Sequence, residues 1–333
     1  MQSFALWYEK SDVESGNSLT AKLNFNLWTE CGWKKNPTYL DIGFMIKNIN
    51  KASKICMFIP FAVKKDNIKD LGAVLSSSSL AGAIFNENLS ATNTQNKLIN
   101  IENIDSKEHF SIYKLDTDSK TEKDRDVHIT PFDDGSILTI DVKNNSTLSK
   151  CDMPVYFRFR LQDISDISKL VHKYSAGKKG LQSIFNVVYT IDFRYMNKRC
   201  LSETLIEKMT DNNCEKIKIE AVHFLLITKT YVELKTDCTS ARKLEEKIWD
   251  DYVNLKNLPM KTDYSTNDLI AYHYKKSFKE DSKEDGKDFS AEFFIKYSVE
   301  KTIIWLYLLL TIGIGAASSI IANILWNLLA NDC

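Results

Sequence analysis

The stretch from Thr302 to Ala330 contains no Asp, Glu, Lys, Arg or His. A helix needs about 20 apolar residues to cross the hydrocarbon core of a bilayer. Trp305 and Tyr307 lie near one end of the stretch and Trp326 near the other, and the headgroup region favours such side chains. A buried helix of a soluble core is the alternative, but the length and the lack of charge disfavour it. The sequence therefore predicts a transmembrane helix over residues 302–330.

Small and hydroxylated residues recur along this predicted helix at alternating steps of three and four residues. That spacing is typical of a left-handed contact between helices, and small residues let helices approach closely in lipid. The amides of Asn323 and Asn327, one turn apart, require hydrogen-bond partners in hydrocarbon. Alternatively, small residues are simply common in membrane helices, and Asn327 lies at the headgroups. We expect this helix to self-associate, through Thr311, Gly315, Ser318, Ser319, Ala322, Asn323 and Asn327.

The flanks of the span predict its orientation. Lys296 and Lys301 precede it and no basic residue follows it, and positive residues stay on the cytoplasmic side. The start of the chain lacks the basic and apolar regions of a signal peptide. The seven cysteines are scattered without a CxxC pair, which fits reduced thiols in a cytosol. We expect a single-pass protein with a cytoplasmic N-terminal part, no metal site and no cofactor.

The residues before the span, about 300 of them, suffice for one large or two modest domains. Apolar and polar residues alternate with a period of two over 19–27, 40–46 and 55–63, which indicates strands with one buried and one wet face. Further strands are predicted at 137–142, 155–161, 184–194, 216–234 and 268–276, and helices at 68–75, 163–174, 201–209, 241–255 and 289–301. The predicted class is α+β: a β-rich antiparallel cytoplasmic region with several helices, then one transmembrane helix.

Composition along the chain suggests four regions. Residues 1–150 are β-rich, and residues 151–258 form an α+β region with a basic patch. Residues 259–301 are predicted to be a charged connector and a juxtamembrane helix, and residues 302–330 the transmembrane helix. Two charged tracts are expected to be solvated: a loop at 116–126 and a flexible connector at 275–288.

Basic residues concentrate between Lys173 and Arg199, opposed only by Asp192. Because the formal net charge is +0, any anion site has to be a local one. Glycines beside a lysine pair let backbone N–H groups and ammonium groups approach a phosphate together, and arginines beside aromatic rings suit single-stranded nucleic acid. The alternative is a solvated loop with ordinary surface charges. The predicted site for a nucleotide or oligonucleotide comprises Arg158, Arg160, Lys173, Lys178, Lys179, Arg194, Lys198 and Arg199.

Motifs of catalysis are absent from the sequence. There is no GxSxG, HExxH, GxGxxG or Walker A pattern. The acidic pairs at 245–246 and 250–251 are expected to form the wet face of a helix, and His223 is expected to be a core residue. We therefore expect no enzymatic activity.

Together these features favour an oligomeric membrane effector. Its cytoplasmic domain would bind a nucleotide or oligonucleotide that gates a channel or pore formed by the C-terminal helices. The alternative is a tail-anchored scaffold or receptor, whose helix only holds a binding domain at the membrane. A membrane-bound hydrolase, the third hypothesis, would need a catalytic cluster that the sequence does not show.

The layout of the chain, the segment WLYLLLTIGIGAASSIIANILW and the basic segments GKKG and RYMNKR resemble membrane effectors of bacterial anti-phage defence, in particular those of the Hailong system. The resemblance implies a homo-oligomer, expected to be a tetramer, in the bacterial inner membrane. It further implies restraint by a short single-stranded DNA oligomer that a partner nucleotidyltransferase makes. Loss of the oligomer would release the effector to depolarise the cell, in an abortive infection.

Overall fold

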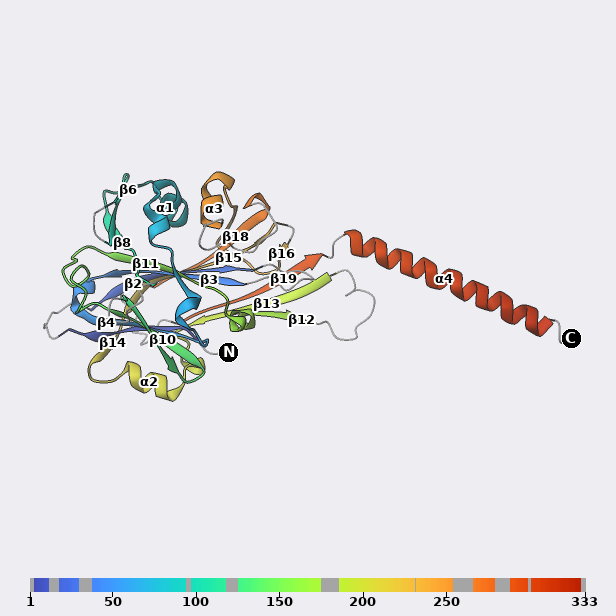
Figure 1. Ribbon diagram of the computed structural model, residues 1–333, viewed down its shortest axis with the longest axis horizontal. Coiled ribbons are helices and arrows are strands. Elements are labelled where there is room, and N and C mark those ends of the chain that lie inside the picture. Colours follow the sequence, from blue (N-terminus) through green and yellow to red (C-terminus); the bar gives the residue numbers. More distant parts are fainter. Residues whose placement is uncertain are drawn as a thin grey trace.

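The computed structural model describes residues 3–11, 18–29, 38–93, 97–117, 125–174, 186–230, 232–253, 266–278, 288–298 and 301–330. Within these residues a β-rich domain is followed by one long helix that projects away from it (Figure 1). The class predicted from the sequence is confirmed in coarse form. Antiparallel pairing dominates the sheets, helices are few, and the C-terminal helix is long and apolar enough to cross a membrane.

The large sheet has the strand order β17-β18-β15-β2-β3-β11-β8-β7-β6, with β5 beside β11. Its strands are antiparallel except for the pairs β15–β2 and β11–β8, which are parallel. The strands are β2 (Thr20–Trp28), β3 (Tyr39–Lys47), β5 (Ile68–Asp70), β6 (Leu89–Asn93), β7 (Leu98–Asn103), β8 (His109–Tyr113), β11 (Val155–Leu161), β15 (Lys218–Lys229), β17 (Ser240–Lys243) and β18 (Leu269–Ser277).

Two smaller sheets complete the domain. The five-stranded sheet contains β14 (Cys214–Lys216), β1 (Ala5–Lys10), β4 (Ala52–Ile59), β10 (Gly135–Asp141) and β9 (Val127–Phe132), in that order. The four-stranded sheet contains β12 (Val171–Tyr174), β13 (Asn186–Tyr195), β19 (Phe289–Ser298) and β16 (Val232–Leu234). The backbone N–H of Phe4 donates to the carbonyl of Arg194 at 2.9 Å, so the two sheets are joined beside Tyr195.

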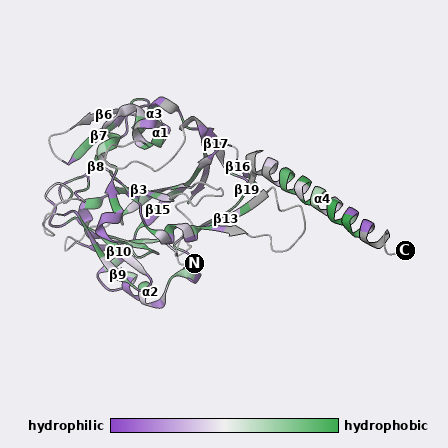
Figure 2. Cartoon of the chain, turned by 45° about the vertical axis from the view of Figure 1, so that its right-hand side comes forward, coloured by the Kyte–Doolittle hydropathy of each residue, from purple (hydrophilic) through white to green (hydrophobic). Residues whose placement is uncertain are grey.

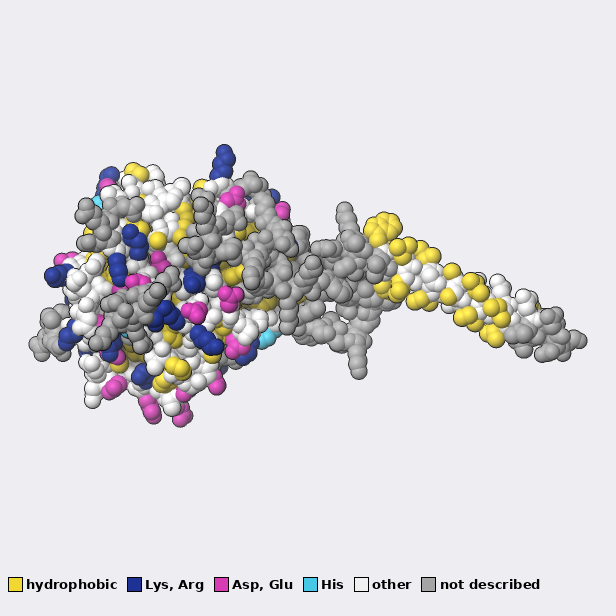
Figure 3. All heavy atoms as spheres, in the orientation of Figure 1, with side chains coloured by type: hydrophobic (Ala, Val, Ile, Leu, Met, Phe, Trp, Pro, Cys, Tyr) yellow, Lys and Arg dark blue, Asp and Glu magenta, His cyan; other side chains and the backbone are white. Residues whose placement is uncertain are grey.

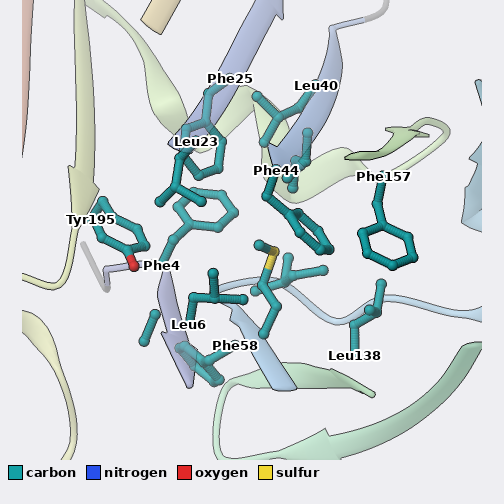
Figure 4. Packing of buried hydrophobic residues seen from close by; sticks show 14 of the residues in the cluster. Phe4, Leu6, Leu23, Phe25, Leu40, Phe44, Phe58, Leu138, Phe157 and Tyr195 are labelled. Carbon is teal, nitrogen blue, oxygen red and sulfur yellow. The ribbon is translucent and has the colours of Figure 1, made fainter. Parts of the chain in front are cut away.

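The core lies between the large sheet and the two smaller sheets (Figure 4). Phe25 of the large sheet packs against Phe4 at 5.5 Å between ring centroids and against Phe193 at 4.6 Å. Phe193 in turn contacts Phe224 of β15 at 4.7 Å. The period-two pattern of β2 explains this placement, because every second side chain points to the same face. Each such buried aromatic ring contributes about 1.5–3 kcal/mol to stability.

Three helices predicted from the sequence are wrong. In place of the helix at 68–75, residues 68–70 form β5 and residues 73–76 form a short 3₁₀ helix. Residues 165–170 form a 3₁₀ helix that leads into β12, and residues 289–298 form β19. Phe289, Ala291, Phe293 and Ile295 are buried, and the residues between them are exposed where the structure describes their side chains. That period of two belongs to a strand with one face in the core.

The remaining helices are short. α1 (Ser78–Phe85) begins within a run of serines, and Asn86, with φ 57°, closes it in the left-handed conformation. α2 (Glu203–Met209) is confirmed, and the Ser202 hydroxyl caps it by accepting from the N–H of Leu205 at 3.2 Å. α3 (Glu246–Val253) is shorter than the predicted helix 241–255, because its first residues form β17.

Strands on both sides of residue 150 share sheets. β11 pairs with β3, and β15 pairs with β2, so the regions 1–150 and 151–258 are interleaved in the large sheet. The tract 116–126 joins β8 to β9, which belong to different sheets. Most of this tract, like most of 275–288, lies outside the described residues.

A histidine pair connects two strands of the large sheet. Nδ1 of His223 lies 3.0 Å from Nε2 of His273, and the rings are stacked at 5.2 Å between centroids. Burial, together with the neighbouring His273, lowers the pKa of His223 to about 4, and burial also lowers the pKa of His273. Lys22 and Lys275 add positive charge beside His223, so both rings are neutral at pH 7.

This pair predicts an acid-sensitive fold. The unfolded state takes up protons on histidine below about pH 6.5, whereas His223 in the folded state does so only near pH 4. The free energy of unfolding should therefore fall as the pH drops from about 6.5 toward 4. Urea midpoints at pH 7.5 and pH 5 measure the effect, and His223→Gln should reduce the difference between them. An equal difference in this variant and in the original protein would contradict the assignment.

Candidate functional site

The two arginines predicted at 158 and 160 do not reach the surface. Both side chains have an exposed fraction of 0%, because they lie on the face of β11 opposite to Phe157 and Phe159, which point into the core. Arg160 Nε donates to Oδ1 of Asp41 at 2.6 Å, and its Nη2 donates to Oδ2 at 3.1 Å. Their assignment to a phosphate site is therefore corrected. Both guanidinium groups are buried and form ion pairs with Asp41, which lies opposite Arg160 on β3.

Helix α3 covers this buried arginine cluster, defined as Arg158, Arg160 and Asp41. The hydroxyl of Tyr252 on α3 accepts from Nε of Arg158 at 2.8 Å and donates to Oδ2 of Asp41 at 2.7 Å. Trp28 Nε1 donates to the same carboxylate oxygen at 2.7 Å. Burial alone would raise the pKa of Asp41, but the charges of Arg160 and Arg158 outweigh it and hold that pKa below its ordinary value.

The cluster contains two cations for one anion. Nη1 of Arg160 has no hydrogen bond with any described residue. Its guanidinium carbon instead lies 5.1, 5.7 and 5.8 Å from three ring centroids, those of Tyr252, Tyr39 and Trp28. The negative faces of these rings compensate the excess charge. The cluster is thus a structural element that fastens α3 to the large sheet.

The other predicted basic residues do not converge within the described part of the chain. Arg194 donates from Nη2 to Asp192 at 2.7 Å and from Nη1 to Sγ of Cys200 at 2.8 Å. Lys198 and Arg199 are exposed in the short turn that follows. Lys173 lies on β12 opposite Tyr189, about 16 Å along β13 from Arg194. Lys178 and Lys179 lie outside the described residues.

The C-terminal helix α4 (Lys301–Ala330) is 30 residues long, or about 45 Å. Tyr307–Asn327 is the part long and apolar enough to cross a membrane, and none of it is buried against the domain. Its apolar side chains are exposed, for example Trp305 at 66% and Trp326 at 72% (Figure 3). Figure 2 shows hydrophobic residues along much of α4, whereas hydrophobic and hydrophilic residues are mixed along the elements of the domain. Water does not favour so continuous an apolar surface, so lipid or other helices have to cover it.

The polar groups of α4 fall into two kinds. The hydroxyls of Thr311 and Ser318 donate to the carbonyls of Tyr307 and Ile314, both at 2.8 Å, so the helix itself satisfies them. Asn323 and Asn327 have exposed side chains, and no hydrogen bond to the described residues is recorded for either amide. Among the described side chains of α4, these two amides therefore require a partner from outside the helix, and the hydroxyl of Ser319 is likewise without a hydrogen bond.

The faces of α4 are also distinct. At about 100° per residue, the seam residues Leu308, Thr311, Gly315, Ser318, Ala322, Leu325 and Leu329 form one stripe. Asn323 and Asn327 lie about 110° and 150° around the helix from the middle of this seam. The predicted packing residues therefore occupy two faces, with Ser319 between them. An added Cβ at Gly315 would meet nothing within 4 Å, so the seam is open to a neighbour.

α4 follows β19 with only residues 299–300 between them. β19 pairs with β13 in unbroken register from Asn186↔Ser298 to Tyr195↔Phe289. In Figure 1 the two strands extend from the domain toward the start of α4. The helix is thus attached to the end of a paired strand.

The fold and the helix together define the class: a β-rich domain with one C-terminal helix able to cross a membrane. The chain matches no model of a known protein family, and a search of curated proteins gives no significant match. The function of the domain therefore has to be inferred from its own residues.

One group of cations, with exposed or half-buried side chains, was missed in the sequence. Lys97, Lys114 and Lys150 line a groove of about 950 Å³ between the large and the five-stranded sheets. They belong to three separate loops and have no common motif. No local pattern in the sequence would have brought them together.

Proposed function

We propose that this chain is a single-pass membrane effector whose C-terminal helices assemble into a channel or pore. Its β-rich domain would lie in the cytoplasm, as the lysines before the span favour, and would bind a nucleotide-type anion that gates the assembly. The resemblance to effectors of anti-phage defence supports a role in depolarising an infected cell.

The observation that carries this proposal is the pair of unpartnered amides on an exposed apolar helix. Asn323 lies about 9 Å from the middle of Tyr307–Asn327, so within the hydrocarbon region its amide needs a partner from a neighbouring helix or from water. In a ring, each helix meets two neighbours through two different faces. The small-residue seam and the asparagine face of α4 provide two such faces, whereas a simple anchor needs neither.

A tail-anchored scaffold is the second candidate. The observation that favours it is that Thr311 and Ser318 satisfy their hydroxyls within the helix, so these residues tolerate lipid without a partner. A pore and a simple anchor therefore differ mainly in whether bulky replacements on the seam abolish function.

Three combined substitutions, Gly315→Leu, Ser318→Leu and Ala322→Leu, are expected to abolish depolarisation. Leucines on the seam keep the helix apolar but prevent close approach of its neighbours. Membrane potential is followed with a voltage-sensitive dye after induced expression, at matched protein levels in the membrane fraction. Ala317→Leu is the control, because it adds bulk on a face away from both the seam and the asparagines.

The control should depolarise cells like the original protein. Depolarisation that persists in the triple variant would contradict a pore built on the seam and favour the tail-anchored scaffold. The same conclusion would follow if the original protein never changed the membrane potential.

A further inference from the structure

The lysine groove, lined by Lys97, Lys114, Lys150, Ser146 and Thr147, lies where loops of two sheets meet. Lys97 precedes β7 and Lys114 follows β8, both in the large sheet, whereas residues 146–150 follow β10 of the five-stranded sheet. The groove holds about 950 Å³ and adjoins a smaller pocket of about 270 Å³ that shares Lys97, Ser146 and Thr147. This is the size of a site for a small molecule.

The charged side chains in the groove are mostly positive, and some of them form no ion pair with the described residues. Lys97 Nζ donates to Oδ2 of Asp126 at 2.7 Å, so its charge is balanced. For the side chains of Lys114 and Lys150, no ion pair or hydrogen bond with the described residues is recorded. The one carboxylate on the wall of the main groove, Asp152, accepts from Asn50 at 2.8 Å. Among the described residues, a net positive charge therefore faces the open space.

The wall of the smaller adjoining pocket is held in place by a hydrogen-bond network of Tyr113, Asp126 and Asn145. Oδ1 of Asp126 accepts from the hydroxyl of Tyr113 and from Nδ2 of Asn145, both at 3.1 Å. Nδ2 of Asn145 also donates to the hydroxyl of Tyr113 at 2.7 Å. Asn145 Oδ1 accepts from the N–H groups of Thr147 and Leu148, which fixes the loop that carries the hydroxyls.

These contacts tie both sheets to one buried carboxylate. Burial raises the pKa of Tyr113, so its hydroxyl stays protonated and continues to donate. Lys97 and the loop that carries Ser146 and Thr147 are thereby positioned before any ligand arrives. Such preorganisation reduces the ordering entropy that binding has to overcome.

We propose that the lysine groove binds a phosphate-bearing anion through Lys114, Lys150 and the hydroxyls of Ser146 and Thr147. Ammonium and hydroxyl donors around an open space suit the several acceptor oxygens of a phosphate chain. In Figure 1 β8 and β10 lie in the part of the domain away from α4, so a soluble ligand fits this place better than a lipid headgroup. The groove would then be the ligand site of the proposed effector. Only the effect of the ligand on the membrane helices rests on the proposed function.

The test compares two double charge reversals in the full chain, purified in detergent. Lys114→Glu with Lys150→Glu changes the groove, and Lys198→Glu with Arg199→Glu makes the same change of charge on the exposed turn after β13. Binding of inorganic triphosphate and of ATP is measured by calorimetry at low and moderate salt. The first probe reports the phosphate chain alone, and the second shows whether a nucleoside adds affinity.

The groove variant is expected to weaken triphosphate binding by about tenfold or more, because two charge-assisted contacts are lost. The turn variant should bind within about threefold of the original protein. Equal loss in both variants, loss only in the turn variant, or no binding to the original protein would each overturn the proposal. Because the assay measures binding and not ion flux, a failure of the proposed ligand site can be distinguished from a failure of the proposed pore. Unchanged unfolding temperatures confirm that both variants are folded.

Discussion

Replacing Asp41 with alanine is expected to destabilise the domain by about 3–5 kcal/mol, which is typical for breaking a buried ion pair from one side. The variant would leave two fully buried guanidinium groups without their carboxylate. It would also remove the acceptor of Trp28 and Tyr252, which hold α3 on the large sheet. Urea denaturation of the full chain in detergent, followed by tryptophan fluorescence, measures the change.

The matched control is Asp192→Ala, which removes the partly exposed ion pair with Arg194. A surface pair of this kind contributes about 0–1 kcal/mol. The pH dependence gives a second check. Because Arg160 and Arg158 hold the pKa of Asp41 below 3.8, its stabilising effect should be complete at neutral pH and fall only as the pH drops below about 4. A change in Asp41→Ala no larger than in the control would contradict the buried cluster.

Removal of residues 301–333 should convert the protein from detergent-dependent to water-soluble without lowering its unfolding temperature. The span Tyr307–Asn327 is not buried against the domain, so deletion removes apolar surface but few contacts. Sedimentation of cell lysates without detergent shows the change in solubility. Thermal unfolding of both forms in one detergent compares the stability of the domains.

A chain with residues 308–327 replaced by leucine and alanine is the control for attachment. It should remain in the membrane fraction, because an uncharged apolar helix of this length is sufficient to span it. Aggregation of the truncated chain, or a lower unfolding temperature, would show that α4 packs on the domain. The placement of α4 away from the domain would then be wrong.

The sheets were largely predictable because their signal is local. Leu19, Ala21, Leu23 and Phe25 alternate with polar residues, and β2 buries that set as expected. The same rule applied to Phe289, Ala291, Phe293 and Ile295, but the charged flanks and the adjacent span favoured a helix there. These residues form a strand because they pair with β13 along their whole length. The long apolar helix α4 was predictable from composition alone.

The basic site was less predictable because burial is a long-range property. The alternation of Tyr156, Arg158 and Arg160 with Phe157 and Phe159 correctly places the arginines on one face of β11. Whether that face is wet depends on α3, which comes almost a hundred residues later and covers it. Asp41 gives no sequence signal as the partner, because it lies in a predicted strand among apolar residues. The lysine groove depends on three loops for the same reason.

The pairing of β19 with β13 limits how the domain and the helix move together. The ten residue pairs of these antiparallel strands are in one unbroken register, so they resist a pull along α4 as a unit. A slip of one residue would turn Phe293 and Ile295 out of the core, because successive side chains alternate between faces. Piston-like sliding of α4 relative to the domain is thus disfavoured. Any motion that α4 transmits to the domain therefore has to preserve this register.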